Sequence, residues 1–124
     1  MRNGIVALIA GLFMGMTGSL VHAETELSDP KPDMDNPRQI VLALTTKDEA
    51  AVNNLLFNVV NIQKFYGQEN VEIAVVGYGA GVRSFLKAES KVAERIQSLQ
   101  LYDIRFIACG NTLEAIGRKG DELI

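Results

Sequence analysis

Short continuous apolar runs alternate along the chain with segments whose apolar residues recur every three or four positions. The runs cover residues 39–45, 71–76 and 104–109. A continuous run of this length, without alternation of apolar and polar residues, is typical of a strand that is covered on both faces. The sequence therefore predicts three buried strands of a parallel sheet.

The segments between the runs have the spacing of amphipathic helices. Behind the first run, Thr46 and Glu49 form a capping-box pattern, and the following helix should end near Gly67. The apolar stripe of this helix consists of Val52, Leu55, Leu56, Val59 and Ile62. A further helix is expected from about Ser90, and a last one with Asn111 as its N-cap.

Alternating strands and helices predict right-handed βαβ units. The expected fold class is α/β, an open, doubly wound parallel sheet with helices on both faces.

Residues 24–37 contain three prolines and no periodicity, so we expect an extended linker there, before one domain over residues 38–124. Three strands are few for such a sheet, and residues 121–124 look like the start of a connection, which favours a truncated C-terminus. In a complete chain, an oligomer would have to cover the bare sheet edge.

The N-terminal segment has the pattern of a secretory signal. A short basic start around Arg2 precedes residues 4–21, which are apolar or small, and Ala23 ends a small-residue cleavage site. An uncleaved membrane anchor is the alternative because the run approaches spanning length, but glycine, serine and threonine dilute it. We predict a signal peptide over residues 1–23 and a periplasmic or secreted protein that keeps no membrane attachment after cleavage.

Composition excludes several classes of function. The chain is 48% hydrophobic and 22% charged, as expected for a globular domain. Cleavage after Ala23 would remove Arg2 and His22, so that 11 of the 12 basic residues remain against 15 acidic ones and the formal charge changes from −3 to −4. A mature chain without histidine cannot build a Ser-His-Asp or Cys-His catalytic unit and loses the commonest metal ligand. We expect no metal or other cofactor, and the mildly acidic balance predicts no nucleic-acid partner.

The second apolar run opens into the glycine-rich residues 77–81. Val82 stands where a Gly-x-Gly-x-x-Gly pattern requires its third glycine, and no Gly-Lys-Ser/Thr of a phosphate loop follows. We therefore expect a tight turn rather than a nucleotide site. The backbone N–H groups of Gly79 and Gly81 can still bind a small anion. Tyr78 either donates a hydrogen bond to a ligand or caps the edge of the core.

Cys109 is the only cysteine of the chain and ends the third apolar run. Free cysteines are often buried packing residues, which is one interpretation. The other rests on Gly110, which has no side chain to cover the sulfur, and on Asn111, the expected N-cap of a helix whose positive end points toward it. Such a position lowers the pKa of a thiol, and without a histidine base the chemistry that remains is exchange at sulfur. An intermolecular disulfide is a third interpretation.

Three segments together resemble the DsrE/DsrF-like family of sulfur-relay proteins: residues 75–82, a helical segment ending near Leu99, and residues 105–113. The most specific piece is the run Ala-Cys-Gly-Asn-Thr-Leu around Cys109, and the resemblance covers residues 38–124. It implies a DsrE-like, flavodoxin-like three-layer sandwich that assembles as trimers or hexamers. It also implies that Cys109 accepts a persulfide sulfur and hands it on.

The leading interpretation is an exported, homo-oligomeric DsrE-like protein that uses Cys109 as a sulfur carrier or thiol-exchange nucleophile of sulfurtransferase type. Its sulfur donor and acceptor would be proteins or small sulfur compounds. Gly110, Asn111 and the N–H groups around Gly79 and Gly81 would stabilise the sulfur anion. The alternative is a non-catalytic oligomeric subunit or small-anion binding module in which Cys109 only packs.

Overall fold

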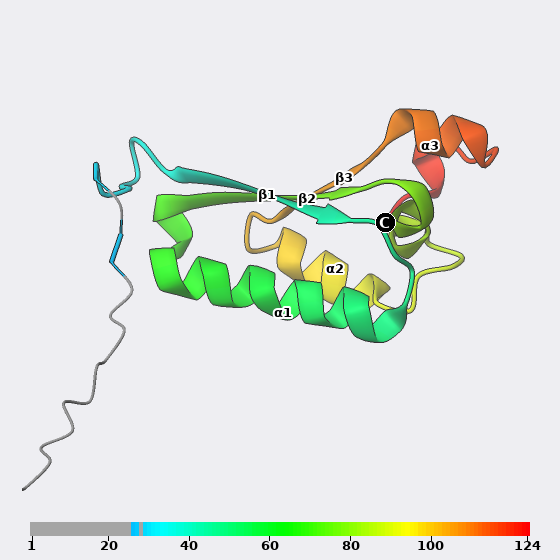
Figure 1. The fold of residues 1–124 in the computed structure, drawn as a ribbon. Helices are drawn as coiled ribbons and strands as arrows, with labels where there is room; N and C mark the ends of the chain where they lie inside the picture. The colour runs from blue at the N-terminus through cyan, green and yellow to red at the C-terminus, as the bar shows by residue number, and fades with distance from the viewer. Residues whose placement is uncertain (1–25, 28) are drawn as a thin grey trace, which may run out of the picture.

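The computed structural model of the protein describes residues 26–27 and 29–124 (Figure 1). The predicted signal peptide, residues 1–23, lies outside them. The described part of the predicted linker contains neither helix nor strand. Asp33 closes a turn there, because its carboxylate accepts hydrogen bonds from the N–H groups of Asp35 and Asn36 at 3.0 and 2.8 Å. Among the described residues, no helix combines the length and the apolar character needed to cross a bilayer.

The described strands form one open parallel sheet in the order β1-β2-β3. Their bounds are Arg38–Leu44 for β1, Val71–Gly77 for β2 and Arg105–Ala108 for β3. The three predicted strands and their parallel arrangement are confirmed. Gly77 pairs with Leu44 on one side and with Ala108 on the other, so the carboxyl ends of all three strands lie at one edge of the sheet.

Three α-helices and three 3₁₀ segments complete the described part of the chain. The α-helices are α1, Glu49–Tyr66, α2, Ala93–Gln100, and α3, Gly110–Ala115. The 3₁₀ segments are η1, Gln68–Asn70, η2, Gly79–Phe85, and η3, Gly120–Glu122. The predicted N-cap Thr46 is wrong, because Asp48 caps α1 and accepts from the N–H of Ala51 at 2.9 Å. The hydroxyl of Thr46 instead accepts from the N–H of Asp48 at 3.1 Å.

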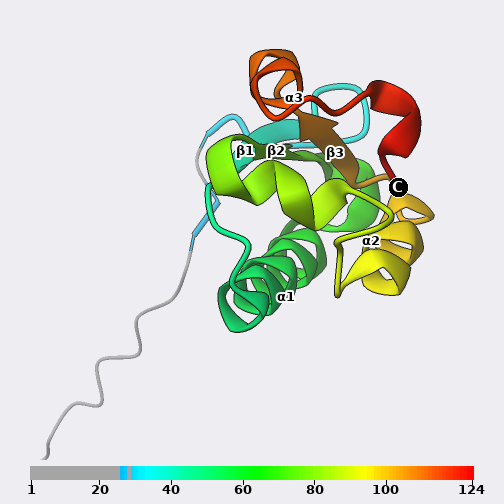
Figure 2. The same ribbon diagram turned by 90° about the vertical axis from the view of Figure 1, so that its right-hand side faces the viewer.

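The helices lie on both sides of the sheet, but unevenly. α1 and α2 lie side by side against one face, whereas α3 lies on the opposite side, beyond the end of β3 (Figures 1 and 2). Because the strands are adjacent in the order of the sequence, right-handed connections carry both intervening helices to the same face. The expected α/β class with an open parallel sheet is confirmed, but the cover on its second face is slight.

Only the central strand has the burial expected of a strand covered on both faces. Five of the seven residues of β2 are buried, whereas in β1 and β3 more exposed and less exposed residues alternate. Val41 of β1 is 70% exposed and Ile107 of β3 is 43% exposed on the open face. The apolar runs therefore predict all three strands correctly. The prediction that both faces are buried is right for β2 and wrong for the outer strands β1 and β3.

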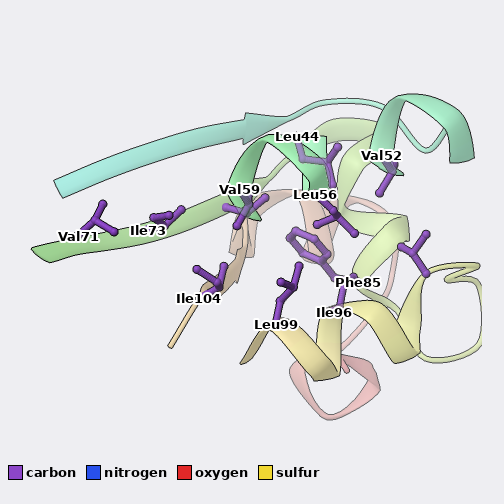
Figure 3. Packing of buried hydrophobic residues seen from close by; sticks show 12 residues of the cluster. Leu44, Val52, Leu56, Val59, Val71, Ile73, Phe85, Ile96, Leu99 and Ile104 are labelled. Carbon is purple, nitrogen blue, oxygen red and sulfur yellow. The ribbon is translucent and has the colours of Figure 1, made fainter. Parts of the chain in front are cut away.

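The main core lies between the sheet and the α1–α2 layer (Figure 3). Its largest fully buried members are Leu44, Val52, Leu56, Val59, Ile73, Val75 and Ile96. Phe85 of η2 packs edge-to-face on Phe106 of β3, with the ring centroids 5.6 Å apart. Because burying one Leu or Ile side chain contributes about 1.5–3 kcal/mol, this core fixes the strand ends on which the candidate site is built.

Candidate functional site

The glycine-rich loop and the cysteine loop meet at the carboxyl edge of the sheet. The N–H of Cys109 donates to the carbonyl of Gly77 at 2.8 Å, which continues the β2–β3 ladder beyond Ala108. The N–H of Tyr78 donates to the carbonyl of Leu44 at 3.1 Å. The two loops therefore lie together at the edge where parallel α/β sheets place their functional crevice.

Cys109 itself is the N-cap of α3. Its backbone is extended, with φ −66° and ψ 118°, and its carbonyl accepts the N–H of Leu113 at 3.0 Å. The prediction of Asn111 as N-cap is wrong, because the helix already begins at Gly110 and places Asn111 in its first turn. The consequence is that the sulfur, rather than the amide oxygen of Asn111, faces the unpaired N–H groups at the start of the helix.

Hydrogen bonds lower the pKa of the Cys109 thiol below its ordinary value. The backbone N–H of Thr112 contributes most, followed by the hydroxyl of Thr112, and the N–H of Asn111 adds a smaller effect. Partial burial acts in the opposite direction and raises the pKa, because it disfavours the thiolate. The net result is a thiol that ionises more readily than a free cysteine, which is the property of a reactive sulfur.

Thr112 is a residue that the sequence analysis missed. Its hydroxyl oxygen accepts a hydrogen bond from the N–H of Gly79 at 3.2 Å, which leaves the hydroxyl proton for the sulfur of Cys109. One side chain thus joins the glycine-rich loop to the cysteine. Thr112 occupies the third helical position, the place from which an N-cap side chain receives its N–H. The sequence could have revealed it if the cap had been placed at Cys109.

The glycine-rich loop has a steric role at this edge. A Cβ atom on Gly77 would meet the ring of Phe85, and one on Gly81 would meet the carbonyl of Leu44. Gly79 adopts φ +55°, in the left-handed region that favours glycine. These contacts support the tight-turn interpretation of the loop and explain how its backbone comes so close to β1.

The N–H groups of the glycine-rich loop do not supply the anion site that the sequence suggested. The N–H of Gly79 donates to the hydroxyl of Thr112 at 3.2 Å, and that of Gly81 donates to the carbonyl of Tyr78 at 3.0 Å. Both N–H groups are therefore already bonded within the protein. The side chain of Tyr78 is 45% exposed beside this turn.

The sulfur is half-buried, and its two sides differ. On one side Cys109 packs against a small apolar cluster of Val82, Leu86 and Leu113. On the other side Gly110 and Asn111 are exposed, and a Cβ atom on Gly110 would meet nothing within 4 Å. The thiol therefore has an apolar backing and an uncovered approach.

Charged side chains hold the C-terminal segment against this apolar backing. Glu89 pairs with Arg83 at 2.8 Å and with Arg118 at 2.9 Å, and Arg118 also pairs with Glu122 at 2.9 Å. These arginines lower the pKa of Glu89, with the hydrogen bond from Arg83 as the largest cause. Leu123 forms an antiparallel bridge with Leu86. The segment after α3 thus closes over η2, behind the cysteine.

In the part of the chain that the structure describes, no group of three or more histidine, cysteine, aspartate or glutamate side chains is placed to hold a metal ion. The chemistry that the residues at this edge offer directly is that of a thiolate with hydrogen-bond donors around it. Attack on a sulfur atom requires a thiolate and no separate base.

Comparisons with known proteins give a consistent result. A model described as the DsrE/DsrF-like family matches residues 26–124. The chain is similar to the solved structure of a protein of unknown function, MTH1491 from Methanobacterium thermoautotrophicum, with 33% identity and a TM-score of 0.66. The match covers 70% of this chain and 76% of that one. No functionally curated protein matches the chain.

Proposed function

The chain belongs to the DsrE/DsrF-like family, a family of sulfur-relay type, and from this premise we propose that it is a sulfur carrier whose Cys109 holds the transferred sulfur. The observation that carries the proposal is the placement of this thiol as the N-cap of α3. There the N–H and hydroxyl of Thr112 and the N–H of Asn111 lower the pKa of the thiol. The residue is only partly buried, which leaves room for a donor molecule to approach.

The proposed reaction is a pair of sulfur exchanges. The Cys109 thiolate attacks the outer sulfur of a persulfide donor, forms a new S–S bond and displaces the donor as its thiol, which keeps the proton. In the second step an acceptor thiolate attacks the outer sulfur of the Cys109 persulfide, and Cys109 leaves as a thiolate. No oxidant is consumed. A cysteine with a lowered pKa serves both steps, because it is ionised when it attacks and is a good leaving group.

The donors on Thr112 and Asn111 have a role in both states of the carrier. A persulfide anion places its charge on the outer sulfur, further from the backbone than the charge of a thiolate. The flexible hydroxyl of Thr112 can follow that charge more readily than a fixed N–H group. Tyr78, exposed beside the loop, is proposed to contact the donor or acceptor.

We further propose that the protein is exported and forms a homo-oligomer, a trimer or a hexamer. The apolar N-terminal run with a small-residue site at Ala23 supports export. The bare second face of the sheet, with Val41 and Ile107 exposed, supports assembly, because exposed apolar patches mark interaction surfaces.

One observation favours a second function, that of a non-catalytic subunit with a structural cysteine. Cys109 packs on one side against Val82, Leu86 and Leu113, as an inert small apolar residue would. In that case the thiol would be a packing group, and the donors around it would serve only to begin α3.

Loading of the isolated protein distinguishes the two functions. The reduced chain is incubated with glutathione persulfide, blocked with an alkylating reagent and weighed intact by mass spectrometry. We expect the mass of one added sulfur on the wild-type chain and none on Cys109→Ser. A wild-type chain that stays unmodified, with a thiol titrating at its ordinary pKa, would establish the structural role instead.

A further inference from the structure

Residues of α1 and α2 line a groove. Both helices lie on the opposite side of the sheet from α3 (Figure 1), so the groove is separate from the cysteine site. Its volume is about 580 Å³, within the roughly 300–1,000 Å³ that ligand sites usually occupy. Val60 and Leu99 give it an apolar lining. The polar residues that line it include Gln63, Lys64, Arg95 and Ser98.

The charge of the groove is positive although the chain as a whole carries −3. Lys64 and Arg95 line it, and no acidic residue does. Among the described residues neither cation forms an ion pair, in contrast to Arg83 and Arg118, which both pair with Glu89. The groove therefore offers two positive charges that carboxylates of the protein have not neutralised.

Arg95 is held in place by neutral partners. Its Nη1 donates to the side-chain oxygen of Asn53 at 2.6 Å, and its guanidinium carbon lies 4.2 Å from the ring centroid of Phe57. A neutral amide and an aromatic ring orient the guanidinium without cancelling its charge. Such a residue is well prepared to bind an anion.

The groove is preformed by bonds at both ends. At the start of α2, Arg95 bonds to Asn53 of α1. Past the end of α2, the side chain of Gln63 donates to the carbonyl of Tyr102 at 2.7 Å. Because the helices are already joined, binding costs little ordering of the protein.

Aromatic surface lies at the same two ends. Tyr102 lines the groove and is 53% exposed, and Phe57, beneath Arg95, is 58% exposed. Exposed rings of this kind make favourable contacts with a flat apolar ligand. The occupant that matches both charge and surface is thus an anion with an apolar body.

We propose that the groove between α1 and α2 binds a small organic anion. Its carboxylate or sulfonate binds the guanidinium of Arg95, and its aromatic or aliphatic body rests on Val60, Leu99 and the ring of Tyr102. Lys64 adds positive charge further along the groove.

Titration of the ¹⁵N-labelled full chain with 2-naphthoate tests this site, with neutral 2-naphthamide as the matched probe. We expect saturable shifts of the amide signals of Gln63, Ser98 and Tyr102 with the carboxylate, and much weaker binding of the amide. Arg95→Gln should weaken 2-naphthoate binding by roughly threefold to fivefold, as expected for the loss of one partly exposed ion pair. Lys64→Gln, which removes a charge further along the groove, should weaken it less. Lys47→Gln, which removes a charge outside the groove, should leave it unchanged.

Three outcomes overturn the proposal. The first is equal binding of the carboxylate and the amide, and the second is shifts that map away from the groove. The third is concentration-dependent shifts of the same residues without any probe, which would make the groove a contact between copies of the chain. Because Arg95→Gln also removes the bond to Asn53, Arg95→Lys serves as the variant that keeps the charge. Arg95→Lys should bind 2-naphthoate more tightly than Arg95→Gln does. Circular dichroism would show that both variants fold.

Discussion

At the scale of single residues, the candidate site depends on Thr112 as much as on Cys109. The candidate nucleophile is the thiol of Cys109, but its lowered pKa comes mainly from the N–H and the hydroxyl of Thr112. The same hydroxyl accepts the N–H of Gly79 at 3.2 Å and so fixes the distance between the two loops. Thr112 is a positioning residue, and its effect is measured as a change in the pKa of the Cys109 thiol.

Replacing Thr112 by valine should raise the pKa of Cys109, because the hydroxyl donor to the sulfur is lost while the backbone N–H remains. Alkylation by iodoacetamide near neutral pH should slow several-fold, and its half-maximal rate should move to higher pH. Thr112→Ser keeps the hydroxyl and should stay close to wild type. Equal alkylation profiles for the valine and serine variants would show that the hydroxyl does not act on the sulfur.

Cys109 also shows what the sequence could and could not predict at this scale. Its position at the end of the third strand followed from an apolar run that stops there. The sequence predicts the cap of α3 at Asn111 because asparagine is a strong N-cap residue and cysteine is not. In the structure the chain turns into helix directly after β3, so geometry and not side-chain preference selects Cys109.

At the scale of elements, the glycine-rich loop allows β2 to turn into η2 close against β1. The carbonyl of Leu44 lies where a Cβ atom of residue 81 would be, and the ring of Phe85 lies where one of residue 77 would be. The sequence predicted a tight turn from the glycines. It could not predict these close contacts, which depend on how the turn packs against a strand distant in the sequence.

Gly81→Ala should destabilise the protein by about 1–3 kcal/mol, because the added methyl group forces the loop away from β1. Urea denaturation followed by circular dichroism measures this loss. Gly120→Ala is the matched control, since its Cβ atom would meet nothing within 4 Å, and it should change the free energy of unfolding little. A similar small effect for both variants would contradict the close packing at Gly81.

The ion pairs around Glu89 couple the C-terminal segment to η2, and their stability should depend on pH. The arginines lower the pKa of Glu89 in the folded state. The stability that this carboxylate contributes is therefore fully present above the unfolded value of about 4.3 and is lost as the pH falls through the lower folded value. The difference in unfolding free energy between wild type and Glu89→Gln should narrow as the pH falls over that window. Glu94→Gln is the control on an exposed face of α2, and a difference for Glu89→Gln that is constant with pH would contradict the coupling.

At the scale of the whole molecule, the arrangement of helices decides which surfaces are free. The sequence predicted an open parallel α/β sheet, and that class is confirmed, because periodic helices between apolar strands leave few other folds. The uneven cover was not predictable from periodicity. It follows from the strand order, which a single sequence does not reveal, and it leaves apolar residues such as Val41 and Ile107 on an open face.

If this open face holds an oligomer together, a charge placed on it should separate the subunits. Ile107→Glu should lower the mass measured by sedimentation equilibrium, because a buried carboxylate without a partner is costly at an interface. Leu101→Glu is the matched control, since Leu101 is exposed on the opposite side of the sheet, after α2. An assembly that survives Ile107→Glu would place the contact elsewhere, and a wild-type monomer would remove the proposal of assembly.

The transfer of a labelled sulfur atom tests the central claim most directly. The chain is loaded with ³⁵S from a persulfide donor, freed of that donor and mixed with an acceptor thiol. We expect about one labelled sulfur per chain, bound through Cys109, and its release to the acceptor in step with the return of the free thiol. Cys109→Ser should carry no label. A wild-type chain that takes up no label, or keeps it when the acceptor is added, would contradict the role of Cys109 as a sulfur carrier.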